Sequence, residues 1–239
     1  MLLALGIAIL LLELKTQIFH DALNAWAIRR VQTLVQEREE FKNHWLGVGV
    51  IQYPSDLLGY AELINETRPE AIIETGTNYG GLAIFLATLL QNLDPNARVI
   101  TVDIDSDRWE GTKNARKLPD GLLSKITFLQ GDSVSNTILE QVKNLVGGRR
   151  AMVILDSLHT SEHVLKELNL YSQFVAPNSF LIVNDTHLEH LRMMGPGEGI
   201  GPLTAVHKFL QSNSSFVVDS RYPRSIISCA PSGFLKRVR

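Results

Sequence analysis

One glycine-rich stretch between two apolar runs constrains the fold of this chain most. It reads Glu74-Thr-Gly-Thr-Asn-Tyr-Gly-Gly81, and it lies between the β-branched run Ala71–Ile73 and the apolar-periodic run Leu82–Leu90. Such an order of residues predicts a strand, a glycine turn and a helix in succession. In a doubly wound α/β sheet, the first turn of this kind lies where a nucleotide-like cofactor binds.

The spacing of the glycines narrows the kind of cofactor. A dinucleotide fingerprint is G-x-G-x-x-G, whose second glycine lets the backbone approach a pyrophosphate. Counted from Gly76, that place holds Asn78, and the next glycines fall at 80 and 81. The turn therefore suits a group without phosphate, such as the amino acid end of S-adenosylmethionine, with its carboxylate at the helix N-terminus and its ammonium facing Glu74. The alternative is a tight turn whose strand-end carboxylate lies in solvent.

Further apolar runs alternate with helical segments and predict the rest of the sheet. Four of them are Val99–Val102, Ile126–Gln130, Ala151–Leu155 and Phe180–Val183. This alternation predicts an α/β, doubly wound (Rossmann-like) and mostly parallel sheet with helices on both faces. Short strands are also expected near Phe216–Val218 and Ile226–Ala230, whereas the basic tail Phe234–Arg239 is predicted to be a solvated end.

Polar residues at the ends of these runs extend the predicted cofactor site. Asp103 lies 27 positions after Gly76, near the place of the acid that binds ribose in dinucleotide folds. Asp105 either shares this role or caps the next helix. Asp132 and Ser133 follow the third run and would contact the adenine, or else cap the helix after them. The remaining cofactor candidates belong to the glycine turn itself: Thr77, Asn78, Tyr79, Gly80 and Gly81.

A second set of polar residues follows the next two strands. Asp156 and His159 come after Ala151–Leu155, and Asn184, Asp185 and His187 come after Phe180–Val183. Parallel strands end at one sheet edge, so these side chains are expected to meet there. Asp156, Asn184 and Asp185 offer oxygen donors suited to Mg²⁺ or Ca²⁺. His159 is the first candidate for a general base, His187 the second and Asp156 the third, although both aspartates can also cap helices.

Composition limits the partners and the compartment. The net charge of −2 gives no basic excess for nucleic acid. The single cysteine, Cys229, excludes an internal disulfide framework and predicts a cytoplasmic location. The Gly/Pro-rich segment from His187 to Pro202 is predicted to form a mobile lid.

The first 41 residues form a separate predicted segment. Residues 1–12 are unbroken apolar sequence, too short for a membrane span of about 20 residues. Helical spacing continues beyond them, so we expect an apolar, amphipathic helical extension. This extension packs on the domain or on a second subunit as a homo-oligomer, or it lies on a membrane through residues 1–20.

Several motifs in order resemble one known family. They include Trp45-Leu-Gly-Val, Tyr53-Pro-Ser-Asp, Ile73-Glu-Thr-Gly-Thr with Gly80-Gly81, Val102-Asp-Ile-Asp, Gln130-Gly-Asp, Ile154-Leu-Asp-Ser with His159, Ile182-Val-Asn-Asp-Thr and Gly233-Phe-Leu-Lys-Arg-Val. The pattern resembles the cephalosporin hydroxylase/rhamnosyl O-methyltransferase family over residues 42–239. The resemblance implies a class I S-adenosylmethionine-dependent methyltransferase domain, with a seven-stranded sheet whose last strand is antiparallel.

The resemblance also implies a Mg²⁺ site and a reaction. Its metal ligands are a carboxylate after the fourth strand and an acidic pair after the fifth, which match Asp156 and the pair Asn184-Asp185. One acid of that pair is an amide here, and lost ligand charge lowers the affinity for a hard cation. We expect an O-methyltransferase acting on a hydroxyl of a small molecule, such as a sugar or natural product. The alternatives are a cofactor-binding protein without catalysis and a nicotinamide-dependent oxidoreductase.

Overall fold

The computed structural model describes residues 43–115, 117–190, 200–223 and 228–239, together with positions 26, 29, 30 and 33. The chain divides into two compact units, Met1–Glu39 and Glu40–Arg239. The four described positions of the first unit are helical. The rest of the predicted extension, including its membrane or subunit contact, lies outside the described residues. Among the helices of the described residues, none has both the length and the apolarity needed to span a membrane.

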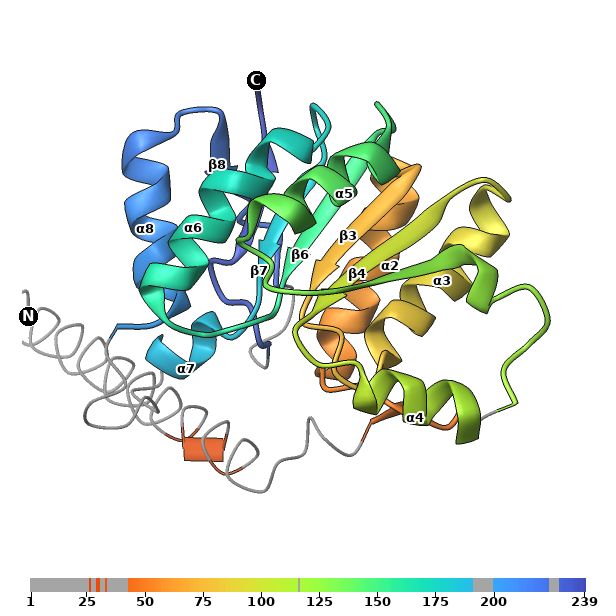
Figure 1. Ribbon diagram of the computed structural model, residues 1–239. Helices are drawn as coiled ribbons and strands as arrows, with labels where there is room; N and C mark the ends of the chain where they lie inside the picture. The colour runs from red at the N-terminus through yellow and green to blue at the C-terminus, as the bar shows by residue number, and fades with distance from the viewer. Residues whose placement is uncertain are drawn as a thin grey trace, which may run out of the picture. The chain divides into compact units, whose positions relative to one another are not determined.

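The second unit contains a seven-stranded sheet with the order β5-β4-β3-β6-β7-β9-β8 (Figure 1). The strands pair in parallel except β9, which runs antiparallel to both of its neighbours. This arrangement confirms the predicted α/β class and the seven strands. The strands are β3 (Ala71–Thr75), β4 (Arg98–Asp103), β5 (Ile126–Gln130), β6 (Ala151–Leu155), β7 (Phe180–Val183), β8 (Phe216–Val218) and β9 (Phe234–Arg237).

Helices cover both faces of the sheet (Figure 1). One apolar core joins α2 and α3 to one face, and a second joins α5, α6 and α8 to the other. Strands β3 and β6 are buried along their whole length, as expected for central parallel strands. The helices are α2 (Pro54–Thr67), α3 (Gly81–Leu93), α4 (Asp107–Ala115), α5 (Asn136–Val146), α6 (Ser161–Tyr171), α7 (Thr186–His190) and α8 (Pro202–Ser212), with single 3₁₀ turns at Leu123–Lys125 and Ser172–Phe174.

The segment before β3 is more ordered than a loop. Strands β1 (His44–Trp45) and β2 (Val48–Gly49) form a short antiparallel hairpin. Helix α2 then begins at Pro54, without a side-chain cap on its first turn. The Asp56 carboxylate in this first turn is buried and accepts hydrogen bonds from the Ser228 hydroxyl (2.6 Å) and the Cys229 backbone N–H (2.7 Å).

The C-terminal tail corrects one prediction. Instead of a solvated end, Phe234–Arg237 forms β9 between β7 and β8, and Phe234 and Leu235 are fully buried. The expected strand at Ile226–Ala230 is wrong for its described residues, because 228–230 lie in bends and loop. The prediction was wrong because the basic residues Lys236 and Arg237 suggested an exposed tail. In the structure both are half-buried at the end of the strand, next to two buried apolar residues. The predicted lid falls mainly on residues 191–199, which lie outside the described residues, and its first residues form α7.

Candidate active site

The strand order places two loops at the point where the chain reverses the direction in which it adds strands to the sheet. After β3 the chain moves outward to β4, whereas β6 lies on the other side of β3. Ligands of open α/β sheets bind at such a switch point, beyond the carboxyl ends of the strands. The turn 76–81 follows β3 and Asp156 follows β6, so both predicted sites flank this switch point. Helices α4 and α7 lie at the same edge (Figure 1).

The glycines of the turn are required by close contacts within the chain. Gly76 has φ +87°, and a Cβ there would lie 1.9 Å from the carbonyl oxygen of Asp156. Gly80 has φ +77°, and its Cβ would lie 2.3 Å from the Trp109 ring. These contacts bring the two loops of the crevice together. Gly80 also starts α3 without a side-chain cap, so the first N–H groups of the helix are suited to a carboxylate.

Glu74 is a buried carboxyl group at the end of β3. Its side chain accepts a 2.5 Å hydrogen bond from the Thr101 hydroxyl, which also contacts the Thr77 hydroxyl at 2.6 Å. Burial raises the pKa of Glu74 to about 8; the Thr101 hydrogen bond lowers it and the nearby Asp103 raises it. Glu74 is therefore mostly protonated at neutral pH, and a cation placed beside it would favour the carboxylate.

Asp103 lies at the end of β4 and holds the glycine turn. Its carboxylate accepts the backbone N–H of Asn78 (2.9 Å) and of Asp105 (3.1 Å). Asp105 in turn accepts the N–H of Asp107, the first residue of α4. The Asn78 amide accepts a hydrogen bond from Arg108, whose guanidinium lies 5.3 Å from the ring centre of the exposed Tyr79.

The two residues predicted to contact adenine differ in environment. Asp132 is exposed, and its carboxylate accepts the N–H of Val134. Ser133 is buried, and its hydroxyl donates to Glu167 (2.6 Å) and lies 3.1 Å from His163 Nε2. The fully buried Glu167 also accepts the Ser157 hydroxyl (2.7 Å). Neither predicted residue caps α5, because Ser135 occupies that position.

The predicted catalytic residues meet beyond β6 and β7. His159 Nδ1 lies 3.0 Å from an oxygen of Asp185, and His159 Nε2 lies 4.0 Å from an oxygen of Asp156. Potential ligand atoms of these three residues lie within 4.8 Å of one another. Burial raises the pKa of Asp156 strongly, and the neighbouring Asp185 carboxylate raises it further. Two carboxylates that repel each other in this way are suited to share a cation.

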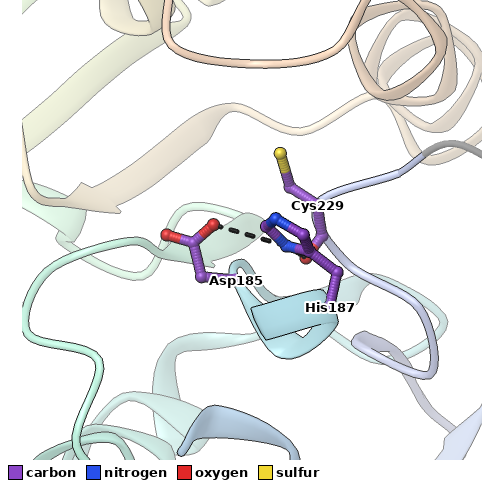
Figure 2. A group of neighbouring side chains, drawn as sticks. All are labelled: Asp185, His187 and Cys229. Atoms are coloured by element: carbon purple, nitrogen blue, oxygen red, sulfur yellow. Dashed lines mark hydrogen bonds and ion pairs between the residues drawn. The ribbon is translucent and has the colours of Figure 1, made fainter. Parts of the chain in front are cut away.

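Asp185 also faces a second histidine (Figure 2). His187 Nδ1 lies 3.6 Å from Asp185 and 3.1 Å from the backbone carbonyl oxygen of Cys229. A carbonyl only accepts hydrogen bonds, so Nδ1 carries the proton of this contact. Cys229 is buried, as expected for a small core residue, and burial raises the pKa of its thiol. Asp185 has φ +59°, an unusual backbone geometry that functional sites often contain.

Asn184 is buried next to Asp185 and contacts a group that the sequence did not reveal. Its Oδ1 accepts a 2.8 Å hydrogen bond from the Tyr60 hydroxyl. The same Tyr60 oxygen lies 3.2 Å from Gln52 Oε1, and Gln52 Nε2 donates to Asp156 at 2.9 Å. Gln52 lies just before α2, and Tyr60 lies on it. Gln52 is 104 positions from Asp156, and Tyr60 is 124 positions from Asn184. No local pattern marks such a pair, so sequence reasoning had no signal for it.

Comparisons with known proteins support one family. Residues 38–238 match the model of the family described as rhamnosyl O-methyltransferase/CmcI. A rhamnosyl O-methyltransferase of Mycobacterium tuberculosis is 29% identical over 203 residues, which cover 82% of this chain and 78% of that protein. The Mycobacterium leprae enzyme of the same name is 29% identical over 167 residues, or 69% of each chain.

Solved structures show the same fold. A structure of CmcI with Mg and SAM is 20% identical, has a TM-score of 0.61, and covers 83% of this chain and 78% of its own. An apo structure of CmcI, also 20% identical, has a TM-score of 0.62 over 82% of this chain and 76% of its own.

Proposed function

Because the chain belongs to the rhamnosyl O-methyltransferase/CmcI family, we propose that it transfers a methyl group from S-adenosylmethionine to a hydroxyl oxygen of a small molecule or glycosyl group. The observation that carries this proposal is the junction of the glycine turn with the Asp156, His159 and Asp185 cluster at one switch point. A cofactor bound across that junction would lie beside side chains able to accept a proton.

The residues present fit the cofactor. The uncapped start of α3 suits the carboxylate of its amino acid end. Glu74 suits the ammonium, and Asp103 retains carboxylate lone pairs for ribose hydroxyls beyond its two backbone bonds. When bound, S-adenosylmethionine supplies an electrophilic methyl carbon on a sulfonium centre. The chain's task is to align the acceptor oxygen with that carbon, which in favourable cases lowers a barrier by about 7–11 kcal/mol.

The residues also fit a divalent ion such as Mg²⁺. Asp156 and Asp185 supply two carboxylates whose mutual repulsion a cation would relieve. The buried Nδ2 of Asn184 has no hydrogen-bond partner among the described residues, and a turned amide, whose oxygen and nitrogen have almost the same shape, would offer its carbonyl oxygen to an ion at this place. We propose Asp156, Asn184 and Asp185 as the residues that would hold the ion. When bound, the ion supplies positive charge that favours an alkoxide over an alcohol.

His159 is the proposed general base. Its Nδ1 faces Asp185 at 3.0 Å, which favours the tautomer with a proton on Nδ1 and a lone pair on Nε2. Its side chain is 36% exposed, so a substrate hydroxyl can reach it. As the acceptor oxygen bonds to the methyl carbon, Nε2 takes the hydroxyl proton. A positioned base of this kind contributes typically 10²- to 10⁴-fold to a rate.

Calorimetry with S-adenosylhomocysteine, S-adenosylmethionine and NAD tests the cofactor, and transfer of a labelled methyl group to a panel of glycosides tests the reaction. We expect binding of the two sulfur cofactors and turnover of at least one glycoside. Binding of NAD alone would point to an oxidoreductase. Binding of S-adenosylhomocysteine without turnover across the panel would favour a protein that binds the cofactor without catalysis.

A further inference from the structure

A buried chain of polar side chains links helix α2 to the proposed ion site. Gln52 donates to Asp156, the Tyr60 hydroxyl lies between Gln52 and Asn184, and Asn184 precedes Asp185. Exposed fractions are 2% for Gln52, 0% for Tyr60 and 2% for Asn184. Water therefore has little access to these groups, and each donor and acceptor depends on its protein neighbours.

In the orientation of the structure, the hydrogen bonds of this chain do not balance. The Tyr60 oxygen faces two acceptor oxygens, Asn184 Oδ1 at 2.8 Å and Gln52 Oε1 at 3.2 Å, but a hydroxyl has only one proton to donate. One of the two acceptor oxygens therefore receives no hydrogen bond from Tyr60. At the other end of the amide, the buried Asn184 Nδ2 has no hydrogen-bond partner within the part of the chain that the structure describes.

Turning the Asn184 amide by half a turn would give each of these hydrogen-bonding groups a matching partner. The oxygen and nitrogen of an asparagine amide have almost the same shape, so the turn needs no additional space. Nδ2 would then donate to the Tyr60 oxygen, and the Tyr60 proton would go to Gln52. The Asn184 carbonyl oxygen would take the place that Nδ2 has in the structure, where it would be available to a cation held by the neighbouring carboxylates.

We infer that Tyr60 is a positioning residue, whose hydroxyl can both donate and accept and so allows the Asn184 amide to present its carbonyl oxygen to a divalent ion. Without the ion, the amide keeps the orientation of the structure; with the ion, the amide is turned. The inference rests on the proposed ion site. It explains how a neutral asparagine can act as a ligand at a position next to Asp185, and it assigns a role to Gln52 and Tyr60, whose hydrogen bonds link the two ligand positions.

The test is a double-mutant cycle on Mg²⁺ affinity, measured by calorimetry on the full chain without substrate. Tyr60→Phe removes two hydrogen bonds from the turned state but only one from the unturned state. It should therefore weaken Mg²⁺ binding by about tenfold, within the roughly 10- to 100-fold range typical of residues that support metal ligands. In the Asn184→Asp background both carboxylate oxygens can bind the ion, so the loss from Tyr60→Phe should be much smaller.

Tyr222→Phe is the matched control. Tyr222 is also a buried tyrosine of the α2 face, but its hydroxyl donates to Glu62 (3.2 Å), and its removal should leave Mg²⁺ affinity unchanged. Equal losses from Tyr60→Phe in both backgrounds, or no loss in either, would overturn the inference. Absence of Mg²⁺ binding by the wild type would overturn both the ion site and this inference, whereas S-adenosylhomocysteine binding in a parallel titration would leave the cofactor part of the proposed function intact.

Discussion

His159 and His187 approach the same carboxylate, that of Asp185, from very different surroundings. The His159 side chain is 36% exposed, and its second nitrogen faces Asp156. The His187 side chain is 6% exposed, and its ring packs edge-on against Tyr53 with 6.2 Å between the ring centres. The His187 Nδ1 proton is held by a backbone carbonyl.

The difference indicates two roles for two similar residues. A general base must reach the substrate hydroxyl and exchange its proton with solvent afterwards, which only the exposed histidine can do. The buried histidine instead ties α7 to the loop at Cys229, which Asp56 also holds from α2. We therefore expect changes at His159 to affect the rate, and changes at His187 to affect stability first.

Asp185→Ala should have the largest effect, because it removes the group that both histidines share. The variant loses one proposed ion ligand and the partner that fixes the His159 tautomer. We expect kcat to fall by about 10³-fold or more and Mg²⁺ binding to disappear. Steady-state kinetics and metal titration check both effects. An unchanged rate in a chelator, for the wild type, would remove the ion from the account while leaving the His159 argument in place.

The histidine pair can be separated by glutamine, which keeps a donor but cannot accept the substrate proton at neutral pH. His159→Gln should lower kcat by about 10²- to 10⁴-fold with little change in melting temperature. His187→Gln should lower kcat by less than about tenfold and reduce stability by about 1–3 kcal/mol, as expected when a buried polar contact is disturbed. Equal kcat losses in the two variants would contradict the assignment of roles.

Glu74 allows the comparison of buried and exposed groups to be extended to the proposed cofactor site. Burial raises its folded pKa to about 8, above the value near 4.5 expected in the unfolded chain. Between these values the folded state keeps a proton that the unfolded state releases, so the contribution of Glu74 to stability is fully present below about pH 4.5 and is lost as the pH rises through about 8. At about 1.4 kcal/mol per pKa unit, the difference between about 8 and 4.5 corresponds to a loss of about 5 kcal/mol at most.

Urea unfolding of the wild type and Glu74→Gln at several pH values checks this. The glutamine variant should lose most of the decline that the wild type shows over that range. If the two proteins have the same pH dependence, the pKa of Glu74 is the same in the folded and unfolded states. Glu74 is then ionised in the folded protein at neutral pH, without a bound cation.

The smallest expected effect concerns the access of solvent to the buried side chains around His187. Cys229 is 3% exposed, and burial raises the pKa of its thiol. Because the thiolate is the reactive form, a thiol reagent should modify the native protein at least about tenfold more slowly than the unfolded protein. His187→Gln should narrow that difference. Rapid modification of the native wild type would show that this side opens to solvent and weaken the contrast with His159.

The sequence was sufficient for features that depend on local patterns. The apolar runs predicted six of the seven strands, because buried parallel strands such as Ala151–Leu155 are continuously apolar. It also placed Asp156, His159 and Asp185 at one sheet edge, since parallel strands share a direction. The strand Phe234–Arg237 was missed because its two half-buried basic residues resemble a solvated tail.

Contacts between distant elements were not predictable in this way. Ser133 is predicted to contact the adenine, and the sequence did not reveal that its hydroxyl donates a hydrogen bond to the buried Glu167 of α6. Asp56, in the first turn of α2, likewise accepts a hydrogen bond from Ser228, which lies far away in the sequence. In both cases a side chain far away in the sequence decides the role, and periodicity carries no information about such pairings.

The most direct test of the central claim is a crystal structure of the protein with S-adenosylhomocysteine and Mg²⁺. The account predicts that the amino acid end of the ligand lies at the start of α3, that its ribose hydroxyls are hydrogen-bonded to Asp103, and that the ion lies between Asp156 and Asp185. A crevice filled by side chains, or a ligand bound away from the turn at residues 76–81, would contradict it.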